Sequence, residues 1–197
     1  MKKQNKSKRQ MRGYSIVELL VSMAIISVLS AIATPSLLRS YRSYQMDDAA
    51  SQVAAQLKFT RYEAIRRNFS LNCLNKPQNG ILTMWTDNVA AGGVANGTWD
   101  PTEKRIVFAA NSVATLVASA SVPGAASLAA VANAGALTTI SPSNGTLTFD
   151  ARGAKVGAGT SVYWIGNTNF GWRAVTVTPS GSIQVWSYAT GSWTQLS

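Results

Sequence analysis

Three residues at the start of a long apolar segment, Gly13, Tyr14 and Glu18, have types and spacing that could do chemistry. A carboxylate inside a membrane costs on the order of 2.5–3.5 kcal/mol, so Glu18 needs a compensating cation. If the chain were cut between Gly13 and Tyr14, the new amino group would lie on the first helical turn, four residues before Glu18. We therefore predict that the amino terminus of a neighbouring copy neutralises Glu18 inside a bundle of packed helices. The alternative is a simple anchor, with Glu18 at the level of the lipid headgroups.

The segment that carries Glu18 is long enough to cross a membrane. Its twenty uncharged residues, Leu19–Leu38, would span about 30 Å as a helix, the thickness of a bilayer core. Six basic residues precede Gly13, which predicts a cytoplasmic amino terminus and a carboxy-terminal domain on the other side of the membrane. A cleaved signal peptide is the alternative. It would be shorter and would end in a small-x-small cleavage site, whereas the helical pattern here continues past Leu38.

Composition restricts the chemistry of the rest of the chain. The net charge is +10, but the chain from Gly13 onward has twelve basic and eight acidic residues and a net charge of only +4. The absence of His and the single cysteine, Cys73, exclude a Ser/His/Asp triad and any site built on His or a Cys cluster. Hydrolysis by paired carboxylates would need two of the few scattered acids in one cleft. We predict no enzyme activity, no metal and no cofactor, and a buried thiol at Cys73.

The elements that would position these residues are a long helix and a β-rich region. Pro35 predicts a bend or local unwinding near residues 31 to 35, or alternatively the end of a first helix. A helical pattern then continues to about Asn68, and Glu63 can pair with Arg66 and Arg67 one turn on. One apolar stripe at helical spacing contains Ala50, Val53, Ala54, Leu57, Ala64 and Ile65.

After Phe69 the sequence changes to strand formers separated by turn residues. The segments NTNFG and PSG resemble hairpin connections, so we predict an antiparallel sheet packed on the helix. The predicted strands are Ser70–Asn75, Ile81–Thr86, Arg105–Ala109, Thr146–Asp150, Ser161–Gly166, Trp172–Thr178 and Ser182–Tyr188.

The middle of the chain is less informative. The Gly/Asn-rich stretch from Asn88 to Asp100 indicates a loop, and the Ala-rich stretch from Ala109 to Leu137 is compatible with strand, helix or extended loop. Six tryptophans could pack in a core or form a surface that binds sugars or bases. Because Gly, Thr and Ser flank them, Trp99 and Trp193 are the two we expect to be exposed.

The amino-terminal motif resembles the signal of type IV prepilins and pseudopilins. In that pattern a basic leader ends in Gly, an aromatic residue follows, and an acid stands at the fifth mature position before an apolar run. Gly13, Tyr14 and Glu18 occupy these places in GYSIVELL, although the aromatic residue is usually Phe. The resemblance implies cleavage after Gly13 by a prepilin peptidase and N-methylation of Tyr14. Pro35 also stands where many pilins have a helix-bending proline.

Later motifs narrow the resemblance to the GspH/FimT type of minor pseudopilin. The segment LKFTRYEAIRRNFSLNC is similar to that family's helix end and first strand, through Arg61, Glu63, Ala64, Ile65, Arg66, Arg67 and Asn68. LTFDARG and WRAVTVTPSGSI resemble its later strands. Residues 87 to 145 are not diagnostic.

Some members of this family bind DNA through a carboxy-terminal Gly-Arg-x-Arg motif. The matching place here reads Gly181, Ser182, Ile183 and Gln184, so both arginines are absent. Without these cations the hairpin has no phosphate clamp. Arg152, Lys155 and Arg173 could form another basic patch, although three scattered cations are more typical of a solvated face.

The sequence therefore predicts an α+β protein of four parts. Residues 1–13 form a prepilin leader, 14–38 a transmembrane and assembly helix, 39–68 its amphipathic continuation, and 69–197 a periplasmic β-rich domain. By resemblance it is a minor pilin or pseudopilin of a type II secretion pseudopilus or type IV pilus. Its partners would be other subunits, the prepilin peptidase and methyltransferase, and the inner membrane. The alternatives are a DNA- or ligand-binding tip subunit and an anchored β domain that never polymerises.

Overall fold

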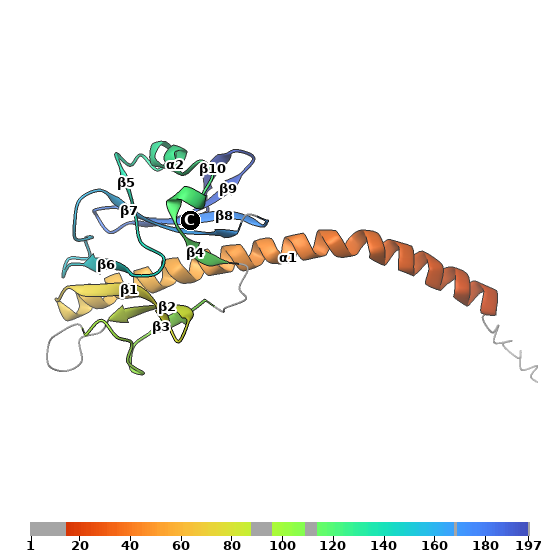
Figure 1. The fold of residues 1–197 in the computed structure, drawn as a ribbon, viewed down its shortest axis with the longest axis horizontal. Coiled ribbons are helices and arrows are strands. Elements are labelled where there is room, and N and C mark those ends of the chain that lie inside the picture. The colour runs from red at the N-terminus through yellow and green to blue at the C-terminus, as the bar shows by residue number, and fades with distance from the viewer. Residues whose placement is uncertain (1–14, 88–95, 109–113, 168, 197) are drawn as a thin grey trace, which may run out of the picture. The chain divides into compact units, whose positions relative to one another are not determined.

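The computed structural model describes residues 15–87, 96–108, 114–167 and 169–196 (Figure 1). The chain divides into two units, one ending at Ser40 and the other beginning at Tyr41. The helical elements are α1 (Ile16–Arg67), a short 3₁₀ turn (Ser119–Ser121) and α2 (Ala125–Val131). The strands are β1 (Leu71–Gln78), β2 (Ile81–Asp87), β3 (Arg105–Val107), β4 (Thr115–Val117), β5 (Leu137–Thr139), β6 (Gly145–Phe149), β7 (Thr160–Asn167), β8 (Gly171–Val177), β9 (Ile183–Ala189) and β10 (Ser192–Gln195).

Helix α1 ends where the sequence predicts, through a glycine-like cap at Asn68. This residue has φ 51°, the left-handed conformation that Asn tolerates better than most residues. The N–H of Asn68 donates to the carbonyl of Ile65, and the N–H of Phe69 donates to that of Ala64. These two bonds form a Schellman motif, which satisfies carbonyls that the helix end would otherwise leave unpaired.

The buried stripe of α1 agrees with the predicted one except at its last member. Met46 joins Ala50, Val53, Ala54, Leu57 and Ala64 in the core. Ile65 is 45% exposed, so its assignment to the stripe was wrong. It lies beside Ala64 on the helix but about 100° around the axis, and that rotation takes it off the buried face.

The first sheet has the strand order β3-β2-β1-β6 and is antiparallel. Strands β1 and β2 are joined by the two-residue turn Asn79–Gly80, in which both residues have positive φ. This is the type I′ geometry, whose twist matches that of the flanking strands, and Asn-Gly is its preferred sequence.

The second sheet has the order β10-β9-β8-β7-β4, with β5 pairing in parallel to β7. The NTNFG and PSG segments lie at the β7–β8 and β8–β9 connections, as predicted. All seven predicted strands are present with ends displaced by at most three residues, apart from Ala109, which lies outside the described residues. In the described ranges, the additional strands are β4 in the Ala-rich stretch, β5 at the end of that stretch and β10 near the carboxyl end.

Two apolar cores lie on opposite faces of the second sheet. The first joins the Tyr41–Arg67 part of α1 to both sheets and contains Leu57, Phe149, Tyr163 and Val175. The second contains Trp164, Trp172, Trp186 and Trp193, packed with Val122 and Leu128. Figure 1 shows α2 on the face of the second sheet that points away from α1. The Ala-rich stretch therefore supplies a cover for the tryptophan face.

This cover overturns the expectation that Trp193 is exposed. Its side chain is 3% exposed, and its Nε1 donates to the carbonyl of Gly124 at 2.8 Å. Trp99 is half-buried, with the guanidinium of Arg105 lying 3.6 Å from its ring centroid. The small residues that flank Trp193 did not predict its burial, because the segment that covers it begins 69 residues earlier in the chain.

The thiol of Cys73 is fully buried on β1, as the sequence predicts. Burial raises its pKa to about 12, although a hydrogen bond with Thr60 lowers it slightly. We expect no labelling of the native full-length chain by iodoacetamide at about pH 8, and complete labelling in denaturant, because the reactive thiolate is suppressed. A Cys73→Ala chain carrying Ser192→Cys at an exposed position is the control and should label at once. Rapid native labelling of Cys73 would contradict this burial.

Candidate functional site

The candidate assembly residue Glu18 lies in the first turn of α1. Gly13 and Tyr14, the predicted cleavage and methylation residues, lie outside the described residues. A carboxylate in the first turn is favoured by the helix dipole, since the unpaired N–H groups there carry partial positive charge. The structure thus places Glu18 at the end of the helix nearest Tyr14 in sequence, where a cation from another chain could reach it.

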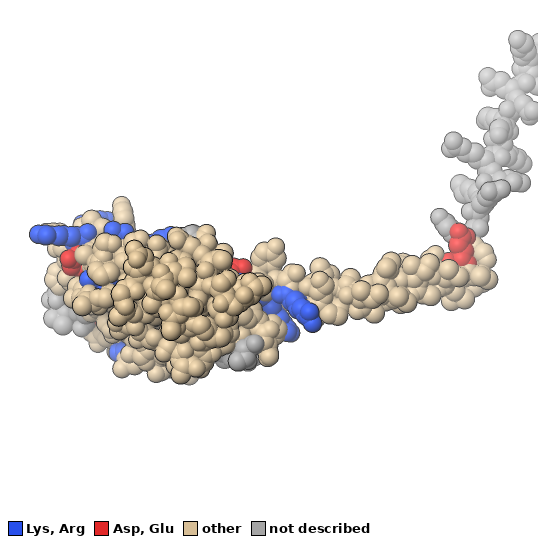
Figure 2. Space-filling view, turned by 90° about the horizontal axis from the view of Figure 1, so that it is seen from above, with Lys and Arg blue, Asp and Glu red and all other residues tan. Residues whose placement is uncertain are grey.

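The surface of α1 from Ile16 to Leu38 is apolar on every side. Its large side chains are between 49% and 79% exposed: Ile16, Val17, Leu19, Leu20, Val21, Met23, Ile25, Ile26, Val28, Leu29, Ile32, Leu37 and Leu38. In Figure 2 the helix is tan between the red acidic atoms at its far end and the blue basic atoms next to the domain. Within the described chain α1 is the one helix long and apolar enough to cross a membrane. A helix that is apolar all round requires a membrane or other helices around it.

The hydroxyl side chains of this helix do not change its apolar character. Ser22, Ser27 and Thr34 each donate to the carbonyl four residues earlier, at 2.7 to 2.8 Å. The hydroxyls are therefore satisfied within the helix, and their small size permits close packing against another helix.

Pro35 lies inside α1, which continues as helix on both sides of it. The alternative in which Pro35 ends a first helix is therefore wrong. Its ring nitrogen has no hydrogen to donate to the carbonyl of Ala31, so a kink at this position remains our prediction.

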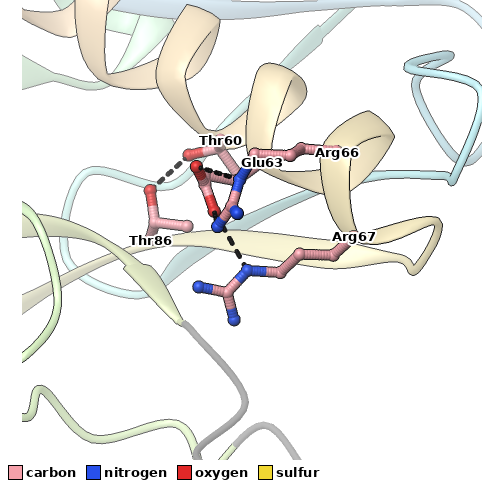
Figure 3. Close-up of polar contacts among 5 residues, drawn as sticks. All are labelled: Thr60, Glu63, Arg66, Arg67 and Thr86. Carbon is pink, nitrogen blue, oxygen red and sulfur yellow. Dashed lines mark hydrogen bonds and ion pairs between the residues drawn. The ribbon is translucent and has the colours of Figure 1, made fainter.

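The motif at the carboxyl end of α1 forms a small ionic cluster (Figure 3). Glu63 accepts from Arg66 at 2.7 and 3.0 Å and from Arg67 at 3.0 Å, as its spacing predicts. The Arg66 hydrogen bond has the largest influence on Glu63 and, together with the Arg67 hydrogen bond, lowers the pKa of Glu63 against the opposing effect of desolvation. Arg61 lies on another side and donates from Nε to the carbonyl of Gly153 at 2.9 Å. The ion pairs thus lie within the last turns of α1, and Arg61 joins this helix to the loop after β6.

Glu63→Gln should lower the free energy of unfolding by about 0.5–1 kcal/mol at neutral pH. Because the folded pKa is lowered, Glu63 stabilises the fold above its unfolded pKa of about 4.3, and this contribution disappears as the pH falls through the folded value. Urea midpoints of both chains at about pH 7 and about pH 2.5 measure the difference. Asp48→Asn, at an exposed acid, is the control. If Glu63→Gln lowers the free energy of unfolding by the same amount at about pH 2.5 as at about pH 7, the ionic explanation is refuted.

A buried polar network behind this cluster escaped the sequence analysis. The Thr60 and Thr86 hydroxyls are 2.6 Å apart (Figure 3), and Gln56 donates to both Thr86 Oγ1 and the carbonyl of Lys104 at 2.9 Å. Gln56 and Thr60 are fully buried. They lie four residues apart on the otherwise apolar face of α1. Two polar residues at this spacing are the sequence feature that could have predicted the buried network. The network fixes the register of α1 against the first sheet.

A second missed contact fastens the beginning of the domain part of α1. Arg173 on β8 donates to Asp47 and also to Ser43, and Arg42 lies 4.3 Å from the ring centroid of Phe170. Arg173 is only 7% exposed, so its interpretation as part of a solvated basic face was wrong. Lys155 is also buried, and its Nζ donates to the carbonyls of residues 156 to 158. Desolvation by burial lowers the pKa of this ammonium group. Arg152 is exposed.

The other acidic side chains of the domain also have local structural partners. Asp150 accepts the N–H groups of Arg152 and Ala154 after β6, Asp48 accepts from Gln52, and Asp87 accepts from Gly97. Within the described ranges, no three His, Cys, Asp or Glu side chains gather where a metal ion could bind.

Comparison with known proteins finds a match for the amino-terminal segment and another for the domain. Residues 8–34 match the model of the prokaryotic N-terminal methylation motif, and residues 49–181 match that of the type II transport protein GspH. The methylation motif and the charge-free helix together are typical of a single-pass inner-membrane protein.

Individual relatives are pilin or secretion-system proteins rather than enzymes. Type II secretion system protein H of Xanthomonas campestris is 32% identical over 71 residues, covering 36% of this chain and 42% of that protein. Pilin-like protein PilA1 of Thermus thermophilus is 35% identical over 95 residues, covering 47% and 56%. The matches thus span about half the length of these relatives.

Among solved structures, the type IV minor pilin FimU of Pseudomonas aeruginosa aligns over 77% of this chain and 93% of its own, with 17% identity and a TM-score of 0.46. Because the GspH model alone matches about two thirds of the sequence, the chain belongs to the GspH family of type II transport proteins.

Proposed function

We propose that the chain is a structural subunit of a type II secretion pseudopilus or a type IV pilus, in a priming, capping or decorating role. The observation that carries this proposal is the apolar surface of α1 from Ile16 to Leu38, with Glu18 in its first turn. The domain from Tyr41 onward buries apolar side chains of its own in two cores. A compact domain with an uncovered apolar helix is suited to side-by-side helix packing.

Assembly would follow processing of the precursor. A prepilin peptidase cuts after Gly13, Tyr14 becomes the methylated amino terminus, and the precursor waits in the inner membrane with its domain in the periplasm. The helix then moves from lipid into the filament, where a neighbour's terminal amino group neutralises Glu18. The methylation-motif match over residues 8–34 supports this sequence of events. The tryptophan faces that would serve a ligand-binding tip are largely covered, and this favours the structural role.

Mass spectrometry of the intact protein from its native host tests the processing step. We expect a chain that begins at Tyr14 and carries one extra methyl group on its amino terminus. Deletion of the host's prepilin peptidase should restore the unprocessed mass. A mature chain that keeps its leader, or is cut elsewhere, would leave Glu18 without the proposed partner and would refute the mechanism.

A further inference from the structure

A basic cleft lies between the domain part of α1 and the turn that joins β8 to β9. Its volume is about 450 Å³, and it is lined by Lys58, Arg61, Ser180, Ser182 and Ile183. A second hollow shares Lys58 and Arg61 and extends along the helix to Tyr62 and Ile65. We call these two hollows together the Lys58 cleft. It combines an ammonium group, a guanidinium group and two hydroxyls with apolar walls.

The walls of the Lys58 cleft are fixed by backbone contacts. The turn approaches the loop after β6 so closely that a Cβ at Gly181 would stand 1.9 Å from the carbonyl of Gly153. That carbonyl in turn accepts from Arg61 Nε, and the N–H of Lys155 donates to the carbonyl of Pro179. The N–H of Ser182 donates to Thr178 Oγ1 at 3.1 Å. The cleft is therefore formed before any ligand binds.

Positive charge in the cleft is not compensated by the domain itself. Among the described residues, no acid forms an ion pair with Lys58 or Arg61, and Arg61 donates to the carbonyl of Gly153 through Nε. Several other cations of the domain do have partners: Arg66 and Arg67 contact Glu63, Arg173 contacts Asp47, and Arg42, Lys104 and Arg105 lie over aromatic rings. An ammonium and a guanidinium one helical turn apart form a receptor for an oxyanion.

The shape and lining of the cleft favour a protein carboxylate over a nucleic acid backbone. A nucleic acid would need a continued row of cations and exposed aromatic rings for its bases. The cleft offers two cations and a single exposed aromatic ring, that of Tyr62, whereas Trp85, Trp164, Trp172, Trp186 and Trp193 are all buried. Ile183 and Ile65 instead provide apolar contacts for an aliphatic side chain next to the acid.

We propose that the Lys58 cleft receives an acidic segment of a neighbouring subunit, with a carboxylate between Lys58 and Arg61 and an aliphatic side chain against Ile183. This inference rests on the proposed function, because it supposes that other subunits surround the domain. It adds a specific contact between domains to the packing of the apolar helices.

Site-specific photo-crosslinking of the full-length chain in its native host tests this contact. A photoreactive phenylalanine replaces Ser182 at the cleft or Thr190 at an exposed turn elsewhere. We expect a protein adduct from position 182, whose crosslinked peptide contains an Asp or Glu, and much less from position 190. Lys58→Gln combined with Arg61→Gln should reduce the adduct about ten-fold. Arg66→Gln, which removes one charge from the same helix outside the cleft, should leave it unchanged.

The filament content of the same cells separates the two proposals. If the chain is present in sheared filaments but position 182 gives no adduct, the cleft proposal fails while the assembly role stands. An adduct that survives the double substitution, contains no acidic residue or disappears with nuclease would also overturn it. If the chain is absent from filaments altogether, the assembly role fails and the cleft proposal with it. Lys58→Gln alone checks folding, because in the described part of the chain the Lys58 side chain forms no ion pair that its loss would break.

Discussion

Glu18→Ala should leave membrane insertion intact and reduce the amount of the chain in sheared filaments by about a hundred-fold or more. Insertion is expected to be unaffected or better, since the substitution removes a charge from the end of an apolar helix. In the filament, however, the neighbour's terminal amino group would be buried without a counterion, which costs about 3–5 kcal/mol per contact. Each 1.4 kcal/mol is worth a factor of ten in the equilibrium. Immunoblots of the membrane and filament fractions provide the measurement.

The control for Glu18 is Asp48→Ala. Asp48 is also an acid on α1, but it is exposed in the domain unit and accepts a hydrogen bond from the neighbouring Gln52. Its loss should not change the distribution between membrane and filament. If Glu18→Ala enters filaments at the normal level, charge pairing does not select the subunit, and packing of the apolar surface alone must do so. If both substitutions reduce the filament content equally, the effect reflects lost folding or solubility instead.

Trp193→Ala should destabilise the domain by about 3–5 kcal/mol, the usual cost of emptying a large aromatic site in a core. The indole packs against Trp164 and Tyr188, with ring centroids 5.7 and 5.1 Å away. Its Nε1 also satisfies the carbonyl of Gly124, the residue that precedes α2. Loss of the ring therefore removes the contact that fastens the α2 cover to the edge strand β10. Chemical unfolding of the full-length chain in mild detergent measures the change.

Thr194→Ala, at the next position on β10, is the matched control. Thr194 is exposed, and a surface substitution of this kind is expected to stay within about 0.5 kcal/mol of the parent. Trp193→Phe should recover part of the loss, because it keeps an aromatic ring in the site but not the hydrogen bond. If Trp193→Ala has the same free energy of unfolding as the parent, α2 does not cover this face in solution.

The sequence by itself determined the features that depend on neighbouring residues. The absence of charge from Leu19 to Leu38, the position of Glu18 and the helix end at Asn68 can all be read from short segments. Strand positions were predictable for the same reason, since alternation and turn chemistry are local properties. The pairing of Glu63 with Arg66 and Arg67 likewise follows from helical spacing, and the structure confirms it.

Only the tertiary structure decided which surfaces are covered and which distant residues meet. Val175 and Thr176 alternate in type, but both are fully buried, because α1 covers one face of the sheet and the Ala-rich stretch the other. Asp47 and Arg173 are 126 residues apart in sequence, and Lys58 shares its cleft with Ser180 and Ser182. Periodicity records how one segment prefers to fold, whereas such contacts depend on the pairing of several strands and on the loops between them. The burial of Trp193 was therefore fixed by packing between segments, which no short stretch of sequence encodes.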